Sequence, residues 1–243
     1  MRVKSGLAVL VVLVLFLSFG EKNKKHVLLF SKTKGYRHES IKDGKIAFLK
    51  LASEKNIEVD TTEDASAFTP ENLKKYSAVV FLSTTGDVLD TNQQNAFTHY
   101  IQSGGGYLGI HAAADTEYDW SWYGKLCGAY FKSHPKIQEA KFKKVKVDAL
   151  VDGLPDEWIR TDELYNYKNI SEEIKVLYTL DETSYTGGEN GANHPIIWYH
   201  EFEGGRAYYT GLGHTKESYV DPKFIRHLWM GLQYVMGEKT GKE

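Results

Sequence analysis

The chain has 243 residues, a formal net charge of −2 and one cysteine, Cys127. The sequence has no basic stripe and no run that interleaves basic and aromatic residues, which argues against nucleic acid as a partner. A single cysteine excludes an internal disulfide, so core packing must hold the fold together. The apolar neighbours of Cys127 indicate a buried structural thiol rather than a nucleophile.

The first residues are typical of an export signal. Two positive charges within residues 1–4 precede an almost unbroken apolar run over residues 7–19, and a polar segment follows. The apolar run is short for a membrane-spanning helix, which needs roughly 20 residues. We therefore predict a signal peptide or N-terminal leader over residues 1–25, an exported (periplasmic or extracellular) protein, and no stable membrane span after cleavage. An uncleaved N-terminal anchor is the alternative.

Residues 26–111 alternate between short apolar runs and segments with helical spacing. The apolar runs predict buried strands at 26–31, 57–60, 78–83 and 107–111. Helices are predicted over 41–55, from the N-cap residue Thr69 with Pro70 in the first turn, and over 91–102 behind the N-cap residue Asp90. Strands that alternate with helices indicate a parallel sheet that is covered on both faces.

The second half of the chain is less regular. Helices are predicted over 119–128 and 222–236, and strands over 142–147, 175–180, 195–200 and 206–210. Neither an internal repeat nor a low-complexity linker divides the sequence. We therefore predict one α/β domain over residues 26–240, built on a flavodoxin-like, doubly wound, mainly parallel sheet with an antiparallel extension.

Polar side chains follow several of the predicted strands. Ligands of open α/β sheets bind beyond the carboxyl ends of the strands. His38 follows the first strand, His111 and Asp115 follow the fourth, and His214 follows the late strand at 206–210. Three histidines that reach one sheet edge from separate segments favour a functional site over three unrelated structural histidines.

Five stretches of the sequence together carry a family resemblance. They lie at residues 35–41, 104–115, 131–135, 194–198 and 205–214 and read GYRHESI, GGGYLGIHAAAD, FKSHP, HPIIW and GRAYYTGLGH. In this order they resemble the ThuA-like (trehalose-utilisation) family, which belongs to the class I glutamine-amidotransferase-like superfamily. The resemblance extends from Val27 to about residue 237 and implies the α/β fold of that superfamily.

The turn after the fourth strand departs from the parent superfamily. Its amidotransferases place a nucleophilic cysteine there, in the pattern Gly-x-Cys-x-Gly, whereas this sequence reads GIHAA over residues 109–113. His111 thus stands where the cysteine would be, and thioester chemistry needs the thiol. Cys127 lies too far along the chain to replace it. We therefore predict no glutaminase activity.

Histidines and carboxylates without a nucleophile support two kinds of chemistry. Imidazole titrates near neutral pH, so the sequence predicts His111, His214 and Asp115 as catalytic acid–base residues. Neutral imidazole also ligates zinc and similar divalent ions. Such a site would draw on His38, His111, His134 and His214 with Asp115 or Glu163. Because no short-range ligand pair such as HExxH occurs, we assign no metal or cofactor, and a divalent metal such as zinc stays an alternative.

Aromatic and polar residues near the same segments are candidates for binding substrate. The chain has 16 Tyr and 5 Trp, and such rings often line sugar sites. The predicted substrate-binding residues are Tyr36, Arg37, His38, Trp120, His134, Glu163 and Trp198. Trp120 belongs to an aromatic group that is either a stacking platform for sugar rings or a cap on the core.

The remaining histidines have structural interpretations. His26 begins a strand, and His99 and His227 lie on helices, where we expect surface or core-edge positions. His200 alternates with exposed positions and is predicted to be solvated. His134 and His194 each precede proline, which fixes an extended backbone and leaves pocket and scaffold roles equally open.

The resemblance implies a role in carbohydrate use. The family is linked to trehalose and related disaccharides, in some cases beside oxidoreductases that make 3-keto sugars. A ketone acidifies the neighbouring C–H bonds, so an acid–base pair could process such a sugar without a covalent intermediate. We predict an enzyme (lyase, hydrolase or isomerase) that acts on disaccharides or glycosides, including 3-keto forms. The alternatives are a non-catalytic sugar-binding module and a metal-dependent hydrolase. The expected partner is a small-molecule sugar, and homo-oligomerisation stays open.

Overall fold

The computed structural model of the protein describes residues 24–238. The predicted leader therefore lies outside the described residues except for its last two positions, and the predicted domain lies outside them only at residues 239–240. Within the described part of the chain, no helix has the combination of length and apolar character that crossing a membrane requires.

A nine-stranded sheet runs through the molecule in the order β2-β1-β3-β4-β11-β10-β9-β6-β7. The first five are parallel: β2 (Glu58–Thr62), β1 (His26–Phe30), β3 (Ala78–Leu82), β4 (Gly106–Ile110) and β11 (Gly205–Thr210). The last four pair in antiparallel fashion: β10 (Pro195–Phe202), β9 (Lys175–Leu180), β6 (Gln138–Lys144) and β7 (Glu157–Asp162). The predicted doubly wound sheet with an antiparallel extension is confirmed.

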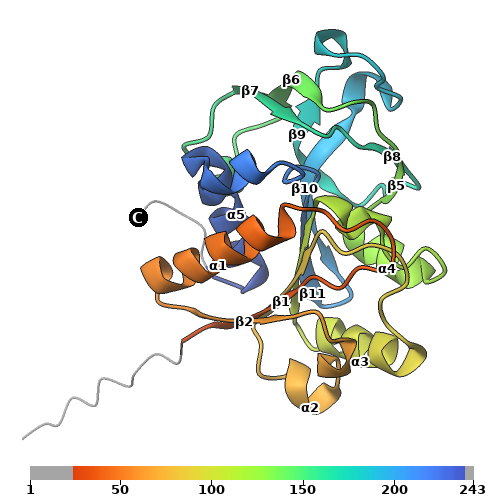
Figure 1. The fold of residues 1–243 in the computed structure, drawn as a ribbon, viewed down its shortest axis with the longest axis vertical. Coiled ribbons are helices and arrows are strands. Elements are labelled where there is room, and N and C mark those ends of the chain that lie inside the picture. Colours follow the sequence, from red (N-terminus) through yellow and green to blue (C-terminus); the bar gives the residue numbers. More distant parts are fainter. Residues whose placement is uncertain (1–23, 239–243) are drawn as a thin grey trace, which may run out of the picture.

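Helices cover both faces of the parallel half. On one face lie α1 (Ile41–Lys55) and α5 (Pro222–Val235), and on the other lie α3 (Thr91–Gln102) and α4 (Ser121–Cys127), with the short α2 (Pro70–Leu73) beside α3 (Figure 1). The predicted caps are present, since Thr69 accepts a hydrogen bond from the Asn72 amide and Asp90 forms a complete capping box with Gln93.

Smaller elements connect these layers. A two-stranded antiparallel sheet joins β5 (Tyr130–Ser133) to β8 (Asn166–Lys168). The 3₁₀ turns are η1 (Ala65–Ala67), η2 (His111–Asp115), η3 (Ala149–Val151), η4 (Glu182–Ser184), η5 (Gly191–Asn193) and η6 (Lys216–Val220). The sequence patterns did not predict β5, β7 or β8, because β5 and β8 are only four and three residues long and β7 and β8 carry polar residues at inward-facing positions.

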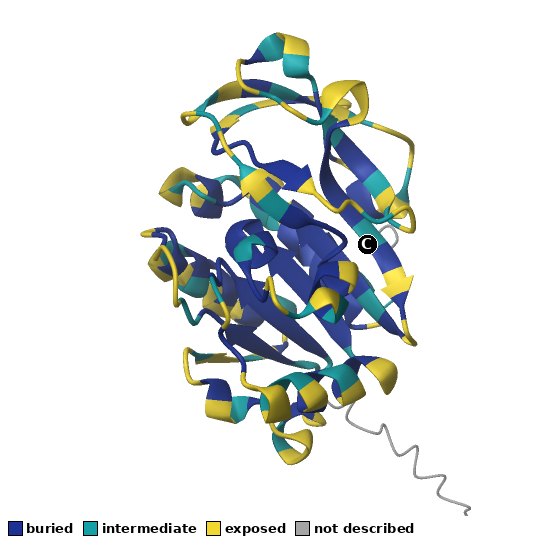
Figure 2. Ribbon diagram, turned by 90° about the vertical axis from the view of Figure 1, so that its right-hand side faces the viewer, coloured by how far each residue is buried: buried dark blue, intermediate teal, exposed yellow. Residues whose placement is uncertain are grey.

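The core follows the parallel strands β1, β3, β4 and β11, which are buried along most of their length, while the edge strand β2 and the outer helix faces are exposed (Figure 2). Every residue of β3 and β4 is buried, as expected for strands covered on both faces. Strand β4 packs closely against α5 at Gly106. A Cβ at this position would lie 2.2 Å from the Val235 carbonyl oxygen, so only glycine fits. Cys127 is also fully buried, and burial raises the pKa of its thiol to about 12, so the reactive thiolate does not form near neutral pH.

Two histidine predictions are wrong. His200 is only 2% exposed, because it lies beneath α4 and its Nε2 hydrogen-bonds the Lys125 carbonyl oxygen at 3.1 Å. His227 is 0% exposed, with its Nδ1 3.0 Å from the Tyr208 hydroxyl. Burial lowers the pKa of His227 to about 3. Both side chains therefore belong to the core.

Candidate active site

Four segments deliver a titratable side chain to one edge of the sheet. His111 follows β4, His214 follows β11, and His38 lies in the loop between β1 and α1. Successive antiparallel pairings from β11 through β10, β9 and β6 leave β7 running in the same direction as β11. The carboxyl end of β7 therefore brings Glu163 to the edge where the histidines lie.

These four residues, which we call the His–Glu cluster, are in mutual contact. The Nε2 atom of His111 lies 3.2 Å from Oε2 of Glu163 and 3.2 Å from Nδ1 of His214. Nδ1 of His214 is 3.0 Å from the same carboxylate oxygen. The His38 ring is perpendicular to the other two imidazoles, with centroids 4.8 and 5.0 Å away. The predicted convergence of the three histidines is thus present in the structure.

His111 sits in a tight turn with an unusual backbone conformation. Its φ is +51°, in the left-handed region that costs a non-glycine residue roughly 1–3 kcal/mol and that is often found at functional sites. Its ring is oriented by the Gly211 carbonyl, 2.9 Å from Nδ1. Nδ1 donates this hydrogen bond, so in the neutral ring the lone pair lies on Nε2, which faces Glu163 and His214.

The loop that carries His38 is fixed to the turn after β3. The Lys34 amide donates to the Thr85 carbonyl at 2.8 Å, and the Thr85 hydroxyl donates to the Tyr36 carbonyl at 2.9 Å. His38 is only 4% exposed, and its Nδ1 has no hydrogen-bond partner among the described residues. Burial, with the neighbouring His111 and His214, lowers the pKa of His38 to about 3, so this imidazole is neutral.

Glu163 and His214 form an electrostatic pair. Burial alone would raise the pKa of Glu163, but hydrogen bonds and charge interactions with His111 and His214 hold it well below its usual range. For His214 the directions are opposite: burial alone would lower its pKa, but the Glu163 carboxylate raises it. The His214 side chain is 18% exposed and that of His111 is 0% exposed. Of these two imidazoles, His214 is the one that a bound molecule can reach.

Asp162 positions the turn that carries His214. Its carboxylate accepts hydrogen bonds from the backbone amides of Gly213 and His214, both at 3.1 Å. Gly213 has a φ of +112°, which glycine adopts without strain. The same carboxylate is paired with the guanidinium of Arg160 at 3.2 Å. Asp162 thus holds two members of the cluster through their backbone, since it also accepts a hydrogen bond from the Glu163 amide at 3.0 Å.

We expect Asp162→Asn to lower the free energy of unfolding by about 3–5 kcal/mol. The side chains of Asp162 and Arg160 are 0% and 8% exposed, so the substitution leaves a buried guanidinium with only the more distant carboxylate of Asp221, at 3.8 Å. Urea denaturation followed by circular dichroism measures the loss. Asp156→Asn is the matched control, since Asp156 is 96% exposed in its pair with Lys144, and its change should stay below about 1 kcal/mol. Equal losses of unfolding free energy in the two variants would contradict the assignment of Asp162 as the buried partner of Arg160.

Three further predicted site residues lie beside the cluster. His134 is 3.2 Å from Oε1 of Glu163, and its side chain is 43% exposed. The carboxylate of Asp115 accepts a hydrogen bond from Tyr118 at 2.7 Å, and burial raises its pKa. Tyr36 packs its ring edgewise on His38 at 4.9 Å and is 65% exposed. These residues form the rim of the site.

Two other predicted substrate contacts have partners elsewhere in the protein. Arg37 forms a bidentate ion pair with Glu63, at 2.8 Å for both contacts. Trp120 stacks on Trp122, which donates to Glu203 in the turn before β11. That turn lies at the amino end of β11, whereas the cluster lies at its carboxyl end. Trp120 therefore lies away from the cluster, and its predicted contact with substrate is wrong. Arg37 lies between the rim residue Tyr36 and His38, and its contact with substrate stays a prediction.

Trp198 also requires a correction. It is 0% exposed, its indole donates to the Cys127 carbonyl at 2.8 Å, and its ring stacks on Tyr209 at 4.4 Å. A side chain enclosed in this way cannot contact a substrate. His194 is likewise part of the scaffold: it is 0% exposed and hydrogen-bonds the Tyr165 carbonyl at 2.8 Å. Of the two histidines that precede proline, only His134 lies at the site.

Sequence reasoning missed two residues that shape the site. Asp162 was overlooked because β7 was not predicted, although an acidic pair directly after a strand is a usable signal. Tyr165 is buried, with its ring centroid 4.3 Å from that of His111, where it forms an apolar wall of the cluster. Nothing in the sequence distinguishes Tyr165 from the many other tyrosines.

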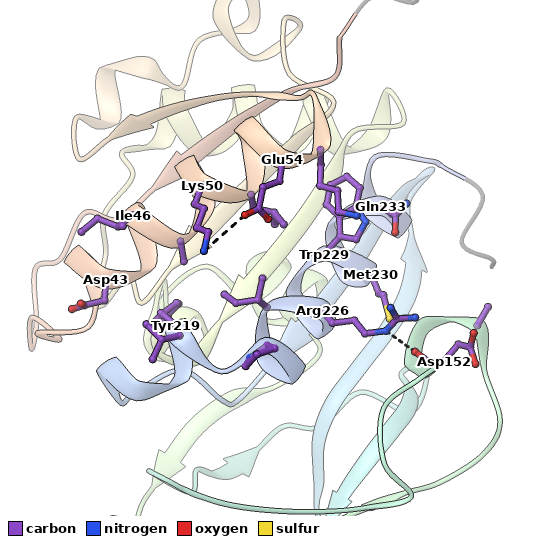
Figure 3. Close-up of a pocket in the computed structure, with 17 residues that line it drawn as sticks. Asp43, Ile46, Lys50, Glu54, Asp152, Tyr219, Arg226, Trp229, Met230 and Gln233 are labelled. Carbon is purple, nitrogen blue, oxygen red and sulfur yellow. Dashed lines mark hydrogen bonds and ion pairs between the residues drawn. The ribbon is translucent and has the colours of Figure 1, made fainter. Parts of the chain in front are cut away.

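A cavity of about 600 Å³ lies between α1 and α5 (Figure 3). None of its lining residues belongs to the His–Glu cluster. Charged groups at its edge interact within the protein, as in the Lys50–Glu54 ion pair at 3.9 Å and the hydrogen bond from Arg226 to the Asp152 carbonyl at 3.0 Å. The titratable groups that converge are thus at the sheet edge and not in this groove.

The sheet, and the histidine in the turn after β4, define a class I glutamine-amidotransferase-like fold that lacks the cysteine of those enzymes. Within that class, the chain belongs to the ThuA family, described as trehalose utilisation, whose model matches residues 26–235. The family gives the protein a carbohydrate-related role.

Several solved structures share the fold. A ThuA-like protein from Parabacteroides merdae matches with a TM-score of 0.76 at 22% identity, covering 90% of this chain and 93% of that one. A ThuA-like protein from Bacteroides uniformis matches with a TM-score of 0.74 at 23% identity, covering 87% and 91%. A β-galactosidase from Bacillus circulans shares the fold over 32% of its chain, with a TM-score of 0.58 at 12% identity and 89% of this chain covered. No match was found among curated proteins.

Proposed function

We propose that the protein is a carbohydrate-processing enzyme that acts on disaccharides or glycosides, including 3-keto forms, at the His–Glu cluster. The observation that carries the proposal is the meeting of three histidines and a glutamate from four separate segments at the ligand-binding edge of an α/β sheet. Membership of a trehalose-utilisation family supports a sugar as the substrate.

The cluster suits proton transfer next to a ketone. His214 is partly exposed and shares a hydrogen bond with a buried carboxylate, which orients the ring and stabilises its protonated form. In a 3-keto sugar, the second ring nitrogen of His214 would take a proton from the carbon beside the carbonyl, and the C–H electrons would form the enolate. The same imidazole would return the proton to the product.

Incubation of the purified protein with trehalose, related disaccharides and their 3-keto forms tests the proposal directly. We expect the wild type to convert at least one 3-keto sugar into a product that chromatography resolves. A protein that binds these sugars without any conversion would instead support the alternative of a non-catalytic sugar-binding module.

We expect no ammonia release from glutamine above the uncatalysed rate. His111 occupies the turn where the amidotransferases carry cysteine, and Cys127 is enclosed in the core with a raised pKa. A coupled glutamate-dehydrogenase assay of the wild type measures this, with Cys127→Ala as the companion variant. Ammonia release at an enzymatic rate in both proteins would refute the prediction.

A further inference from the structure

We infer that His38, His111, Glu163 and His214 bind one divalent transition-metal ion, such as zinc. One nitrogen or oxygen atom from each residue lies within 4.8 Å of the other three. The inference deepens the proposed function and rests on it for the role of the ion, which would be a Lewis acid that polarises a sugar oxygen. With the ion bound, Nε2 of His111 and Nδ1 of His214 would be ligands, and a titratable rim residue, Asp115 or His134, would take the proton in place of His214.

The hydrogens available in the cluster do not satisfy its lone pairs. Nδ1 of His111 donates to the Gly211 carbonyl, so its neutral ring presents a lone pair on Nε2. That lone pair faces the carboxylate oxygen of Glu163 at 3.2 Å, and both atoms are acceptors. Nδ1 of His214 contacts both of them and carries at most one hydrogen. A divalent ion at the centre of this triangle would satisfy all three atoms at once, whereas the rival arrangement needs an added proton on Nε2 of His111.

The spacing of the three atoms matches a coordination polyhedron. Their separations are 3.0, 3.2 and 3.2 Å. Ligand atoms about 2.0–2.1 Å from a metal lie about 3.3 Å apart in a tetrahedron and about 3.0 Å apart along an octahedral edge. His38 would supply the fourth ligand, since one of its ring nitrogens lies within 4.8 Å of the other three donor atoms. Its Nδ1 is buried and has no hydrogen-bond partner among the described residues, so no hydrogen bond has to be broken at that nitrogen when the ring binds a metal.

The surrounding residues orient the proposed ligands in the way metal sites require. The Gly211 carbonyl fixes the His111 tautomer, and His134 contacts the second carboxylate oxygen of Glu163 at 3.2 Å. Asp162 holds the His214 backbone. Three neutral imidazoles and one carboxylate carry a charge of −1, which a divalent cation offsets. The mixed nitrogen and oxygen donors favour zinc, cobalt, nickel or iron over calcium or magnesium.

Titration of untagged, chelator-treated wild-type protein with CoCl₂ tests the inference without any sugar. We expect one Co²⁺ per chain, visible-region d–d absorption, and displacement of the cobalt by ZnCl₂. We also expect metal-free protein to regain catalysis of a confirmed sugar substrate when zinc or a similar ion is added. Absence of stoichiometric binding at submillimolar Co²⁺ and Zn²⁺, in protein whose circular dichroism is native, would overturn the inference.

Variants distinguish two explanations of the cluster, a bound metal ion and a single proton that its members share. Glu163→Gln and His38→Gln should each weaken metal binding by at least about 10-fold, whereas the exposed His99→Gln should leave it unchanged. Unchanged binding in folded Glu163→Gln protein would place the ion elsewhere and refute the site. Full sugar turnover in the presence of chelator would refute the metal and leave the proposed function standing. Stoichiometric metal binding without turnover of any sugar would refute the proposed function and leave the metal site standing.

Discussion

Replacing His214 with Gln is expected to lower sugar turnover roughly 10²–10⁴-fold, the usual contribution of a positioned proton donor or acceptor. Glutamine keeps a hydrogen-bonding group of similar size, but it neither titrates in this pH range nor replaces imidazole well as a metal ligand. His111→Gln should have an effect of the same order, because its Nε2 faces the same carboxylate oxygen. The measurement is kcat and KM on a confirmed 3-keto disaccharide.

Affinity should change much less than rate in these variants, because on the proposed function the sugar would also contact the rim. His99→Gln, on the exposed surface of α3, is the control and should retain wild-type kinetics. Near-wild-type kcat in both His111→Gln and His214→Gln would remove these histidines from the mechanism. The chemistry would then have to be assigned to Asp115 and Glu163, the remaining carboxylates of the site.

Acid is expected to destabilise the protein through a histidine far from the site. The pKa of His227 is lowered from 6.5 to about 3 by burial first and then by the positive charge of Arg160. In the unfolded chain His227 therefore binds a proton below about pH 6.5, whereas in the folded protein it binds one only below about pH 3. The stability that neutral His227 contributes is fully present above pH 6.5 and is lost as the pH falls, at about 1.4 kcal/mol per unit.

Comparison of the wild type with His227→Gln measures this loss. Between pH 6.5 and about pH 4.5 we expect the free energy of unfolding of the wild type to fall about 2–3 kcal/mol more than that of the variant. Urea denaturation at several pH values gives both curves. His99→Gln, whose side chain is exposed, should follow the wild type. Parallel curves for wild type and His227→Gln would show that His227 is not the proton acceptor.

The sequence predicted the parallel half of the fold well because its signals there are local. The buried apolar runs of β1, β3 and β4 and the caps at Thr69 and Asp90 each depend on a few neighbouring residues. In the antiparallel extension, inward-facing positions are polar, as at Arg160 and Asp162 in β7. Apolar periodicity is therefore weak there, and β7 was not predicted.

The site was predictable to the extent that it follows strand ends. His38, His111 and His214 were found because the carboxyl ends of parallel strands share one edge. The errors at Trp198 and Trp120 have another cause. Residue type alone does not tell whether an aromatic ring is enclosed, as Trp198 is, or lies at the opposite end of the sheet, as Trp120 does.

Deuterium exchange tests most directly the claim that the His–Glu cluster performs proton transfer on a keto sugar. Wild-type protein is incubated with a 3-keto disaccharide in D₂O, and proton NMR follows the signals of the carbons beside the ketone. We expect the wild type to exchange these hydrogens for deuterium, or to convert the sugar, far faster than His214→Gln does. Sugar binding by the wild type with neither exchange nor product, from the keto sugar or its parent, would contradict the account.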